Sequence, residues 1–168
     1  TPYVEATFPT RIKAMRYLEP SRPLVPADAA VGLITDEAGE YLMQLRDSNA
    51  DIFFPDHWGC FGGALAPGEN HEQALARELM EELNLAISTC AVKKFTRYTF
   101  DFTSVGYYEI NRVFYDIVMP PALKLELKLG EGQKMAFLDS DSLLKARMVP
   151  YDQFAIWMHV YRDKISDA

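Results

Sequence analysis

A glycine-rich turn followed by an acidic helix, at residues 62–85, is the sequence feature that most constrains the fold. Asn70 is a favourable N-cap, and Gln73 completes a capping-box pattern, so we expect a helix over Asn70–Leu83. Asn84 suits the left-handed conformation in which many helices end. The helix also has an apolar stripe, which we expect to be buried against a sheet. That stripe carries Leu75, Leu79 and Leu83.

Segments with β-strand composition surround this helix. Residues 113–119 alternate between apolar and other side chains, and Asp36–Gly39 supplies a turn between two other segments. Because strands precede, separate and follow a few helices, we expect an α/β (α+β) fold, a mixed β-sheet sandwiched between helices. The expected strands are Ala29–Thr35, Glu40–Arg46, His57–Gly63, Val92–Phe102, Tyr107–Met119 and Met135–Leu138. Further helices are expected at Ser140–Ala146 and Tyr151–Lys164.

Chain length and proline placement predict a single domain with an N-terminal arm. At 168 residues and 49% hydrophobic, the chain suits one compact domain with one core. Residues 1–27 contain five prolines, which fix φ and remove backbone donors. We therefore expect an extended arm with one short strand at 1–27 and the domain proper at 28–168. The arm either caps its own sheet or crosses to a partner.

Charge and cysteine content exclude several classes of protein. A net charge of −7 argues against a non-specific nucleic-acid binder, which needs a basic surface to displace counterions. The same charge repels phosphates, so a phosphate-handling site here requires local cations or bound metal. Cys60 and Cys90 form no disulfide framework and suit a reducing cytoplasm. The apolar runs are too short to cross a bilayer, so we expect a cytoplasmic protein without a membrane partner.

Three glutamates share one face of the expected helix. Glu78, Glu81 and Glu82 stand at i, i+3 and i+4, where like charges cost a few tenths of a kcal/mol per pair, about 0.2–0.5. Such a cluster of hard oxygen ligands suits Mg²⁺ or Mn²⁺. The alternative is a solvated helix face, with Arg77 as an ordinary ion-pair partner. The glycines before the helix favour a site, because they let the backbone approach closely and expose a carbonyl.

The segment resembles the Nudix box, G-x5-E-x7-R-E-U-x-E-E-x-G-U, in which U is a bulky aliphatic residue. Asn84 stands where the family has glycine, and we expect the helix end to survive this departure. The resemblance implies the Nudix fold and Mg²⁺-dependent hydrolysis of the diphosphate bond of a nucleoside diphosphate derivative. The matching residues are Gly63, Glu69, Arg77, Glu78, Leu79, Glu81, Glu82 and Leu85.

Carried over residue by residue, the resemblance assigns roles within this segment. Glu78, Glu81 and Glu82 would hold the metal ions, with the carbonyl of Gly62 as a further ligand. Several ions would neutralise the diphosphate and lower the pKa of a bound water. The structural residues of the box, which would fasten the loop to the helix, are Gly63, Glu69 and Arg77.

A second resemblance lies at Glu131-Gly132-Gln133, which is similar to the stretch of MutT-type Nudix enzymes that supplies a catalytic carboxylate. It implies that Glu131 is a metal ligand or the general base that activates water. The alternative is a solvated glutamate in a turn. Glu109 and Asp101 are rival candidates for the base.

Three residues are candidates for substrate binding. Asp152 resembles the base-reading Asn or Asp of MutT-type enzymes, or it is a first-turn Asp favoured by the helix dipole. Arg46 and Trp58 flank an aromatic loop that would set a cation on a phosphate and stack a base or sugar. In the alternative interpretation, Phe53, Phe54 and Trp58, or at least two of them, simply cover the core.

Two substrate groups and two other activities stay open at this stage. Nucleoside triphosphates, including oxidised purine nucleotides, compete with nucleotide sugars, because the box leaves the leaving group undefined. A catalytically inactive Nudix-like nucleotide-binding module is the alternative from a different class, although no acidic ligand is missing. A Nudix-type isomerase would need Cys and His ligands, which we do not find. We expect a small-molecule nucleotide as partner, and the resemblance also allows a homodimer.

Overall fold

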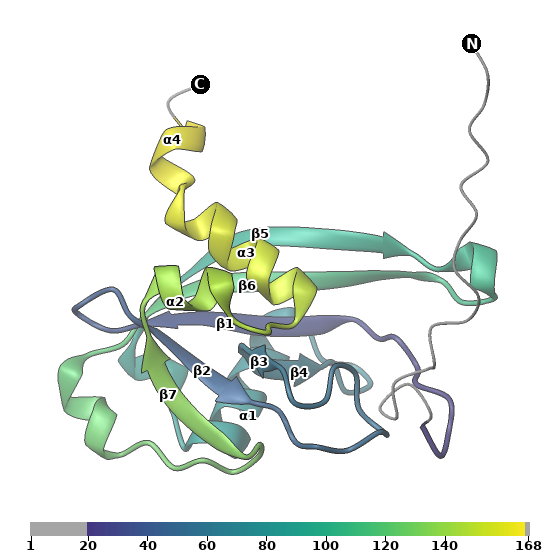
Figure 1. Cartoon of the computed structure of the whole chain (residues 1–168), viewed down its shortest axis with the longest axis horizontal. Coiled ribbons are helices and arrows are strands. Elements are labelled where there is room, and N and C mark those ends of the chain that lie inside the picture. The colour runs from purple at the N-terminus through teal and green to yellow at the C-terminus, as the bar shows by residue number, and fades with distance from the viewer. Residues whose placement is uncertain (1–19, 167–168) are drawn as a thin grey trace.

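The computed structural model describes residues 20–166, which form one mixed sheet covered by helices on both faces (Figure 1). Its seven strands are β1 (Ala29–Thr35), β2 (Tyr41–Leu45), β3 (Trp58–Gly59), β4 (Phe61–Ala64), β5 (Ala91–Asp101), β6 (Glu109–Val118) and β7 (Lys134–Leu138). The α-helices are α1 (His71–Leu83), α2 (Ser140–Lys145), α3 (Pro150–Val160) and α4 (Arg162–Ser166). Three single 3-10 turns complete the elements: η2 (Ile87–Thr89), η3 (Thr103–Val105) and η4 (Pro121–Leu125).

The central strand β1 organises the sheet. The main path runs β3-β2-β1-β6-β5, while β4 also pairs with β1 and β7 with β2. Strand β1 is parallel to β6 along its whole length and antiparallel to β2 and β4. One parallel pair among antiparallel ladders makes the sheet mixed, as expected from the order of strands and helices.

Alternate side chains of β1 contribute to two hydrophobic cores, one on each face of the sheet. Ala30 and Ile34 point to the face that α1 covers, and the leucines of α1 are fully buried there. Val31 and Leu33 point to the opposite face, where α2 and α3 pack. This period-2 alternation places the sheet between helices. The predicted fold class, a mixed sheet sandwiched between helices, is confirmed.

Two expected elements are each divided in two. The segment expected as one strand, His57–Gly63, changes partner at Cys60, because β3 pairs with β2 whereas β4 pairs with β1. The closing helix expected over Tyr151–Lys164 breaks at Tyr161, where the backbone leaves helical geometry at φ −99° and ψ 11°. Helices α3 and α4 therefore meet at a bend. The other expected elements differ from the observed ones only by one or two terminal residues.

Both ends of α1 form as the sequence predicts. The Asn70 side chain accepts the N–H of Gln73 at 2.9 Å, and the Gln73 side chain accepts the N–H of Asn70 at 2.9 Å. Asn84 adopts the left-handed conformation, φ 56° and ψ 34°, and Leu85 donates its N–H back to the Leu79 carbonyl at 3.1 Å. The departure from glycine at Asn84 therefore leaves the helix end intact.

Replacement of Asn84 by alanine is expected to lower the free energy of unfolding by about 1 kcal/mol, because an alanine Cβ is strained in the left-handed region. Asn84→Gly, which restores the family's residue, should change the stability by no more than about 0.5 kcal/mol. Urea unfolding of the two variants beside the parent tests this. Equal stability of the alanine and glycine variants would contradict the assignment of Asn84 as the left-handed cap.

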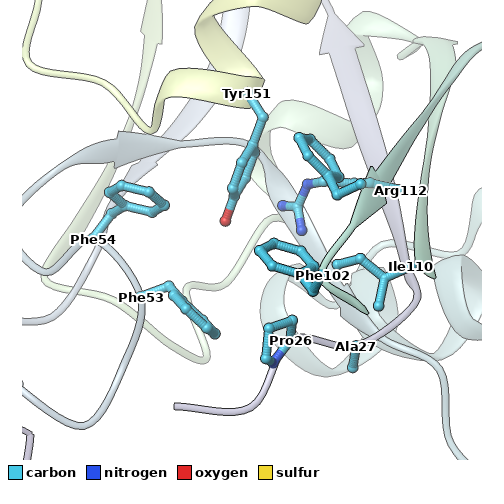
Figure 2. A pocket seen from close by; sticks show the side chains of 9 residues that line it. Pro26, Ala27, Phe53, Phe54, Phe102, Ile110, Arg112 and Tyr151 are labelled. Atoms are coloured by element: carbon cyan, nitrogen blue, oxygen red, sulfur yellow. The ribbon is translucent and has the colours of Figure 1, made fainter. Parts of the chain in front are cut away.

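The described part of the N-terminal arm, residues 20–27, runs along its own domain without forming a strand. Ser21 donates from both its N–H and its hydroxyl to the Asp51 carboxylate at 2.6 Å. Pro26 and Ala27 then line one side of a cavity (Figure 2). The short strand expected in the arm is absent from residues 20–27, and residues 1–19 lie outside the described part. Within residues 20–166, no helix is long and apolar enough to cross a membrane.

Candidate functional site

Helix α1 presents its three glutamates at very different depths. Glu82 is buried, with 5% of the residue exposed. The Glu78 side chain is 17% exposed, and that of Glu81 is 61% exposed. The exposure of the carboxylates therefore increases from Glu82, which faces β4, through Glu78 to the solvated Glu81. A purely solvated acidic face would not bury Glu82 in this way.

The buried Glu82 carboxylate is held by two donors. The N–H of Gly62 donates to its Oε2 at 2.8 Å, and Gln44 Nε2 lies 3.5 Å from its Oε1. Burial, with the nearby negative charges of Glu78 and Glu131, raises the pKa of Glu82 to about 7. Burial likewise raises the pKa of Glu78, although Arg77 opposes the shift. Carboxylates thus cluster on this face of α1, with Arg77 as their cation.

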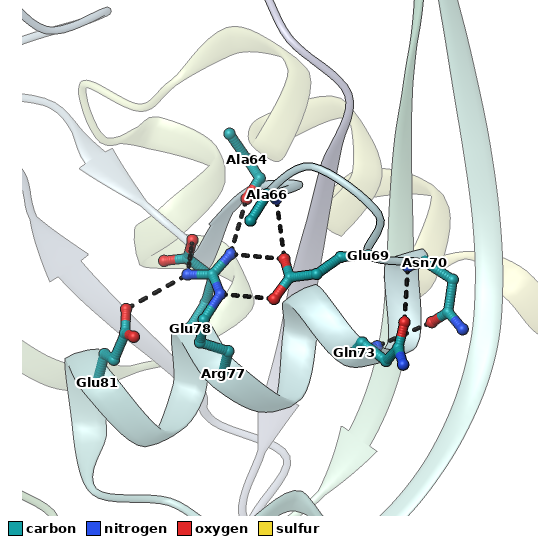
Figure 3. Close-up of polar contacts among 8 residues, drawn as sticks. All are labelled: Ala64, Ala66, Glu69, Asn70, Gln73, Arg77, Glu78 and Glu81. Atoms are coloured by element: carbon teal, nitrogen blue, oxygen red, sulfur yellow. Dashed lines mark hydrogen bonds and ion pairs between the residues drawn. The ribbon is translucent and has the colours of Figure 1, made fainter.

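Arg77 ties the turn to the helix (Figure 3). Its Nε and Nη2 donate to the two Glu69 carboxylate oxygens at 2.8 and 2.9 Å, and Nη2 also donates to the Ala64 carbonyl at 3.0 Å. Nη1 reaches Glu78 at 2.8 Å and Glu81 at 3.3 Å. The hydrogen bonds from Arg77 lower the pKa of Glu69 to about 2. Five contacts from one planar group require the fork geometry of arginine.

We call the face of α1 that carries Glu78, Glu81 and Glu82 the acidic face. Arg77→Lys is expected to slow any reaction that depends on this face by about 10- to 100-fold, the range for residues that orient ligating groups. A single ammonium cannot contact both Glu69 oxygens, Glu78 and the Ala64 carbonyl together. Steady-state turnover beside a thermal melt measures the effect. Arg97→Lys, an exposed arginine on β5, is the matched control and should change neither quantity. Unchanged turnover in Arg77→Lys would contradict a positioning role.

Glycines make the close packing of this region possible. Gly62 has φ +125°, and a Cβ there would stand 2.3 Å from the Ala30 carbonyl oxygen. A Cβ at Gly63 would stand 2.5 Å from the Glu78 carboxyl group. A Cβ at Gly130 would stand 2.3 Å from the Glu81 carbonyl oxygen. Gly62 and Gly63, which lie in strand β4, therefore approach both β1 and the acidic face as closely as backbone allows.

The turn at residues 130–132 brings Glu131 to the acidic face. The N–H of Gly130 donates to the Glu82 carbonyl at 2.7 Å, so the turn packs directly on the last turn of α1. The exposed Glu131 then lies near enough to raise the pKa of both Glu78 and Glu82. The rival candidates, Glu109 and Asp101, lie opposite each other as the last strand partners of β5 and β6. Neither is among the groups that shift the pKa of Glu78 or Glu82.

The donor set of this face suits a hard divalent cation. Carboxylate oxygens are what Mg²⁺ and Mn²⁺ prefer, and a bound cation would offset the charge of a carboxylate as deeply buried as Glu82. As folded, Glu81 turns toward Arg77 and one oxygen of Glu82 bonds the Gly62 N–H. Across the described residues, no three acidic, histidine or cysteine side chains already surround a common point.

An aromatic cavity of about 320 Å³ lies beside this region (Figure 2). Phe53 and Phe54 reach it from the loop after β2, and Phe100 and Phe102 from the end of β5. The other lining residues are Pro26, Ala27, Ile110, Arg112 and Tyr151. Its size and its apolar lining with one charged side chain are typical of a small-molecule site.

None of the three residues predicted to bind substrate lines this cavity. Arg46 Nε donates to the Phe53 carbonyl at 3.0 Å and so holds the aromatic loop. Trp58 packs beneath Lys134, whose Nζ lies 5.2 Å from its ring centroid. Asp152 is 1% exposed and accepts the N–H of Cys60 at 2.9 Å. Its carboxylate also contacts Arg112 Nη2 at 3.4 Å, which places it behind the cavity wall.

Sequence reasoning missed two polar residues that face these groups. Gln44 contacts Glu82 from inside an otherwise apolar strand, and Arg112 enters the cavity from β6. The sequence does show a long polar residue within each of these largely apolar strands, and such a side chain needs a partner when it is buried. The sequence pattern does not reveal which partner each one has.

Comparisons with known proteins agree with this geometry. A model of the NUDIX domain matches residues 25–167. A curated relative, nucleoside triphosphatase NudI of Enterobacter sp. (strain 638), is 40% identical over 60 residues. That match covers 36% of this chain and 42% of the relative, so the chain spans less than half the relative's length.

Solved structures share the fold at low sequence identity. The MutT protein of Methanosarcina mazei Go1 superposes with a TM-score of 0.65 at 18% identity, over 83% of this chain and 99% of that one. The dihydroneopterin triphosphate pyrophosphohydrolase of E. coli gives 0.66 at 16%, over 84% and 99%. An Ap4A hydrolase of C. elegans gives 0.59 at 19%, over 84% and 100%. At such identities the likeness establishes the fold alone.

Proposed function

The chain belongs to the Nudix family, and from this premise we propose that it hydrolyses the diphosphate linkage of a nucleoside diphosphate derivative with the help of Mg²⁺. The observation that carries the proposal is the buried Glu82 on the helix face where Arg77 holds Glu78 and Glu81. Burial of an acidic group against the glycines of β4 is costly, and the contacts with the Gly62 N–H and Gln44 offset only part of that cost. A bound cation offsets more of it.

In this proposal, Glu78, Glu81, Glu82 and the Gly62 carbonyl hold the divalent ion. When bound, the ion neutralises the diphosphate and acidifies water. Arg77 and Glu69 keep the turn and the helix in fixed relation, so that the ligating carboxylates need little reorganisation. Glu131 accepts the proton of the attacking water, since its turn packs on the end of α1 and its charge raises the pKa of both Glu78 and Glu82.

A short extended segment couples the cavity to the acidic face. The N–H of Cys60 donates to Asp152 beside the cavity, and the N–H of Gly62 donates to Glu82 on α1. Two residues of extended chain span roughly 6–7 Å, which is shorter than a nucleoside triphosphate. A nucleotide with its base in the cavity can therefore direct its phosphates toward the acidic face.

Nucleoside triphosphates are the first substrates to test. The relative that shares 40% identity is named as a nucleoside triphosphatase, and the similarity of the Glu131 turn to MutT-type enzymes favours the same class over nucleotide sugars. The volume of the cavity accommodates a base in either case.

The experiment is incubation of the purified protein with Mg²⁺ and a panel of nucleoside triphosphates, nucleotide sugars and dinucleotides, with products separated chromatographically. Mg²⁺-dependent release of a nucleotide from one class supports the hydrolase and identifies the substrate group. Binding of nucleotides without turnover of any class would overturn it in favour of a binding module.

A further inference from the structure

Arg112 is the one charged side chain among the described residues that line the aromatic cavity (Figure 2). Its guanidinium lies 4.1 Å from the ring centroid of Tyr151 and 5.8 Å from that of Phe114. Nη2 contacts the buried Asp152 carboxylate at 3.4 Å. These contacts hold the guanidinium at the back of the cavity, with its nitrogens directed into the space between Tyr151 and Phe102.

Among the residues that the structure describes, the buried Nε–H of Arg112 has no hydrogen-bond partner. Buried donors are almost always satisfied, because an unmade hydrogen bond costs the desolvation of the group. Asp152 does not satisfy Nε, since its nearest contact is to Nη2 and its other oxygen accepts the Cys60 N–H. Because Nε is buried, a molecule in the cavity would instead meet the terminal nitrogens of the guanidinium, which Figure 2 shows in the space between Tyr151 and Phe102.

The side chains around the cavity determine which edge of a ring fits. Arginine carries five N–H donors and no acceptor. Asp152, the adjacent acceptor, is buried behind the wall. The Tyr151 hydroxyl, seen in Figure 2 toward Phe53 and Phe54, either donates or accepts and so does not discriminate. The charged end of the cavity therefore presents donors only.

We propose that Arg112 is a specificity-determining residue that selects nucleotides whose base carries a carbonyl oxygen on the edge facing it, over nucleotides that carry an amino group there. This rests on the proposed function, because it assigns the cavity to the base of the same substrate. The aromatic rings stack on the base and tolerate any ring. The guanidinium donates to the carbonyl oxygen, and in hypoxanthine also to the adjacent N7, as it does to O6 and N7 of guanine in DNA.

Two matched pairs of bases test this choice. Hypoxanthine and adenine differ at position 6, where one has a carbonyl oxygen and the other an amino group. Uracil and cytosine differ in the same way at position 4. An amino group facing Arg112 would place donor against donor. The carbonyl-bearing member of each pair should bind at least about fivefold more tightly, the lower end of what such contacts discriminate.

The first measurement is calorimetric binding of inosine monophosphate and adenosine monophosphate, followed by kcat/KM for the four corresponding triphosphates. Monophosphate binding does not depend on hydrolysis, so the base preference and the proposed reaction can fail separately. Arg112→Met alone would leave Asp152 buried without its cation and would risk misfolding. The double variant Arg112→Met/Asp152→Asn removes both charges and keeps an acceptor for the Cys60 N–H.

We expect the double variant to bind both members of each pair within about twofold, whereas the parent prefers the carbonyl member by about fivefold or more. Arg97→Met, which removes an exposed cation from β5, should retain the preference. A preference that survives in the double variant overturns the assignment to Arg112. Failure of the parent to bind either monophosphate, or a parental preference for the amino member, overturns it as well.

Discussion

Glu82→Gln is expected to lower turnover of any nucleotide substrate by on the order of a hundredfold or more, while the protein still folds. The substitution keeps the size of the side chain and leaves an oxygen to accept the Gly62 N–H, which lies 2.8 Å from Oε2. It removes the buried negative charge that is proposed to hold the divalent ion. Because burial disfavours that charge in the absence of an ion, its loss should not lower the thermal midpoint.

The measurement is kcat and KM for the best substrate at saturating Mg²⁺, beside thermal melts with and without Mg²⁺. Glu72→Gln is the matched control, since Glu72 is exposed on the first turn of the same helix. We expect its turnover to stay within about twofold of the parent, as for surface substitutions away from a site. Turnover at the parental rate in Glu82→Gln would sink the proposed role of the buried carboxylate, and with it the metal site on α1.

Gly62→Ala is expected to lower the free energy of unfolding by about 3 kcal/mol or more. The backbone at Gly62 has φ +125°, where a side chain is strained. The added Cβ would also stand 2.3 Å from the Ala30 carbonyl oxygen and 2.8 Å from Val31 Cα in the central strand. Neither neighbour is the tip of a flexible side chain, so β1 and β4 must separate.

Gly39→Ala separates the two causes. Gly39 also has positive φ, +78°, but a Cβ there meets no atom within 4 Å. It should cost only the conformational strain, about 1–2 kcal/mol. Chemical denaturation of both variants gives the difference, which reports the close approach of Gly62 to β1. A Gly62→Ala protein as stable as Gly39→Ala would show that β4 can move away from β1. That would contradict the fixed position of β4 against the acidic face.

The sequence alone determined the local elements that depend on near neighbours in the chain. The capping pair Asn70 and Gln73 and the left-handed Asn84 fix the ends of α1, because each bond spans only a few residues. Helical spacing placed the glutamates on one face and the leucines on another, and both outcomes follow from 3.6 residues per turn. The family motif and the mixed-sheet class were predictable for the same reason, since they depend on spacing and element order.

Only the tertiary structure decided how deeply each glutamate is buried. Glu78, Glu81 and Glu82 are equivalent in the sequence pattern, yet the packing of β4 buries Glu82 and leaves Glu81 in solvent. The position of Glu131 likewise depends on the contact of Gly130 with the end of α1, across 48 residues of chain. Burial and long-range contact are properties of the assembled layers, and no local spacing encodes them.

Asp152 and Arg112 also have positions that depend on long-range contacts and that the sequence pattern does not encode. From its position in the sequence, Asp152 is either a helix-start residue or a residue that reads the base. The fold places it behind the cavity wall, where it accepts the Cys60 N–H. Arg112 carries no motif, and it becomes a candidate for base recognition only because β6, β5 and the Phe53 loop meet around its guanidinium. The sequence by itself thus determined the helix, its acidic face and the family. The folded sheet decided which carboxylate is buried and which donor remains unsatisfied, because those depend on groups brought together from distant parts of the chain.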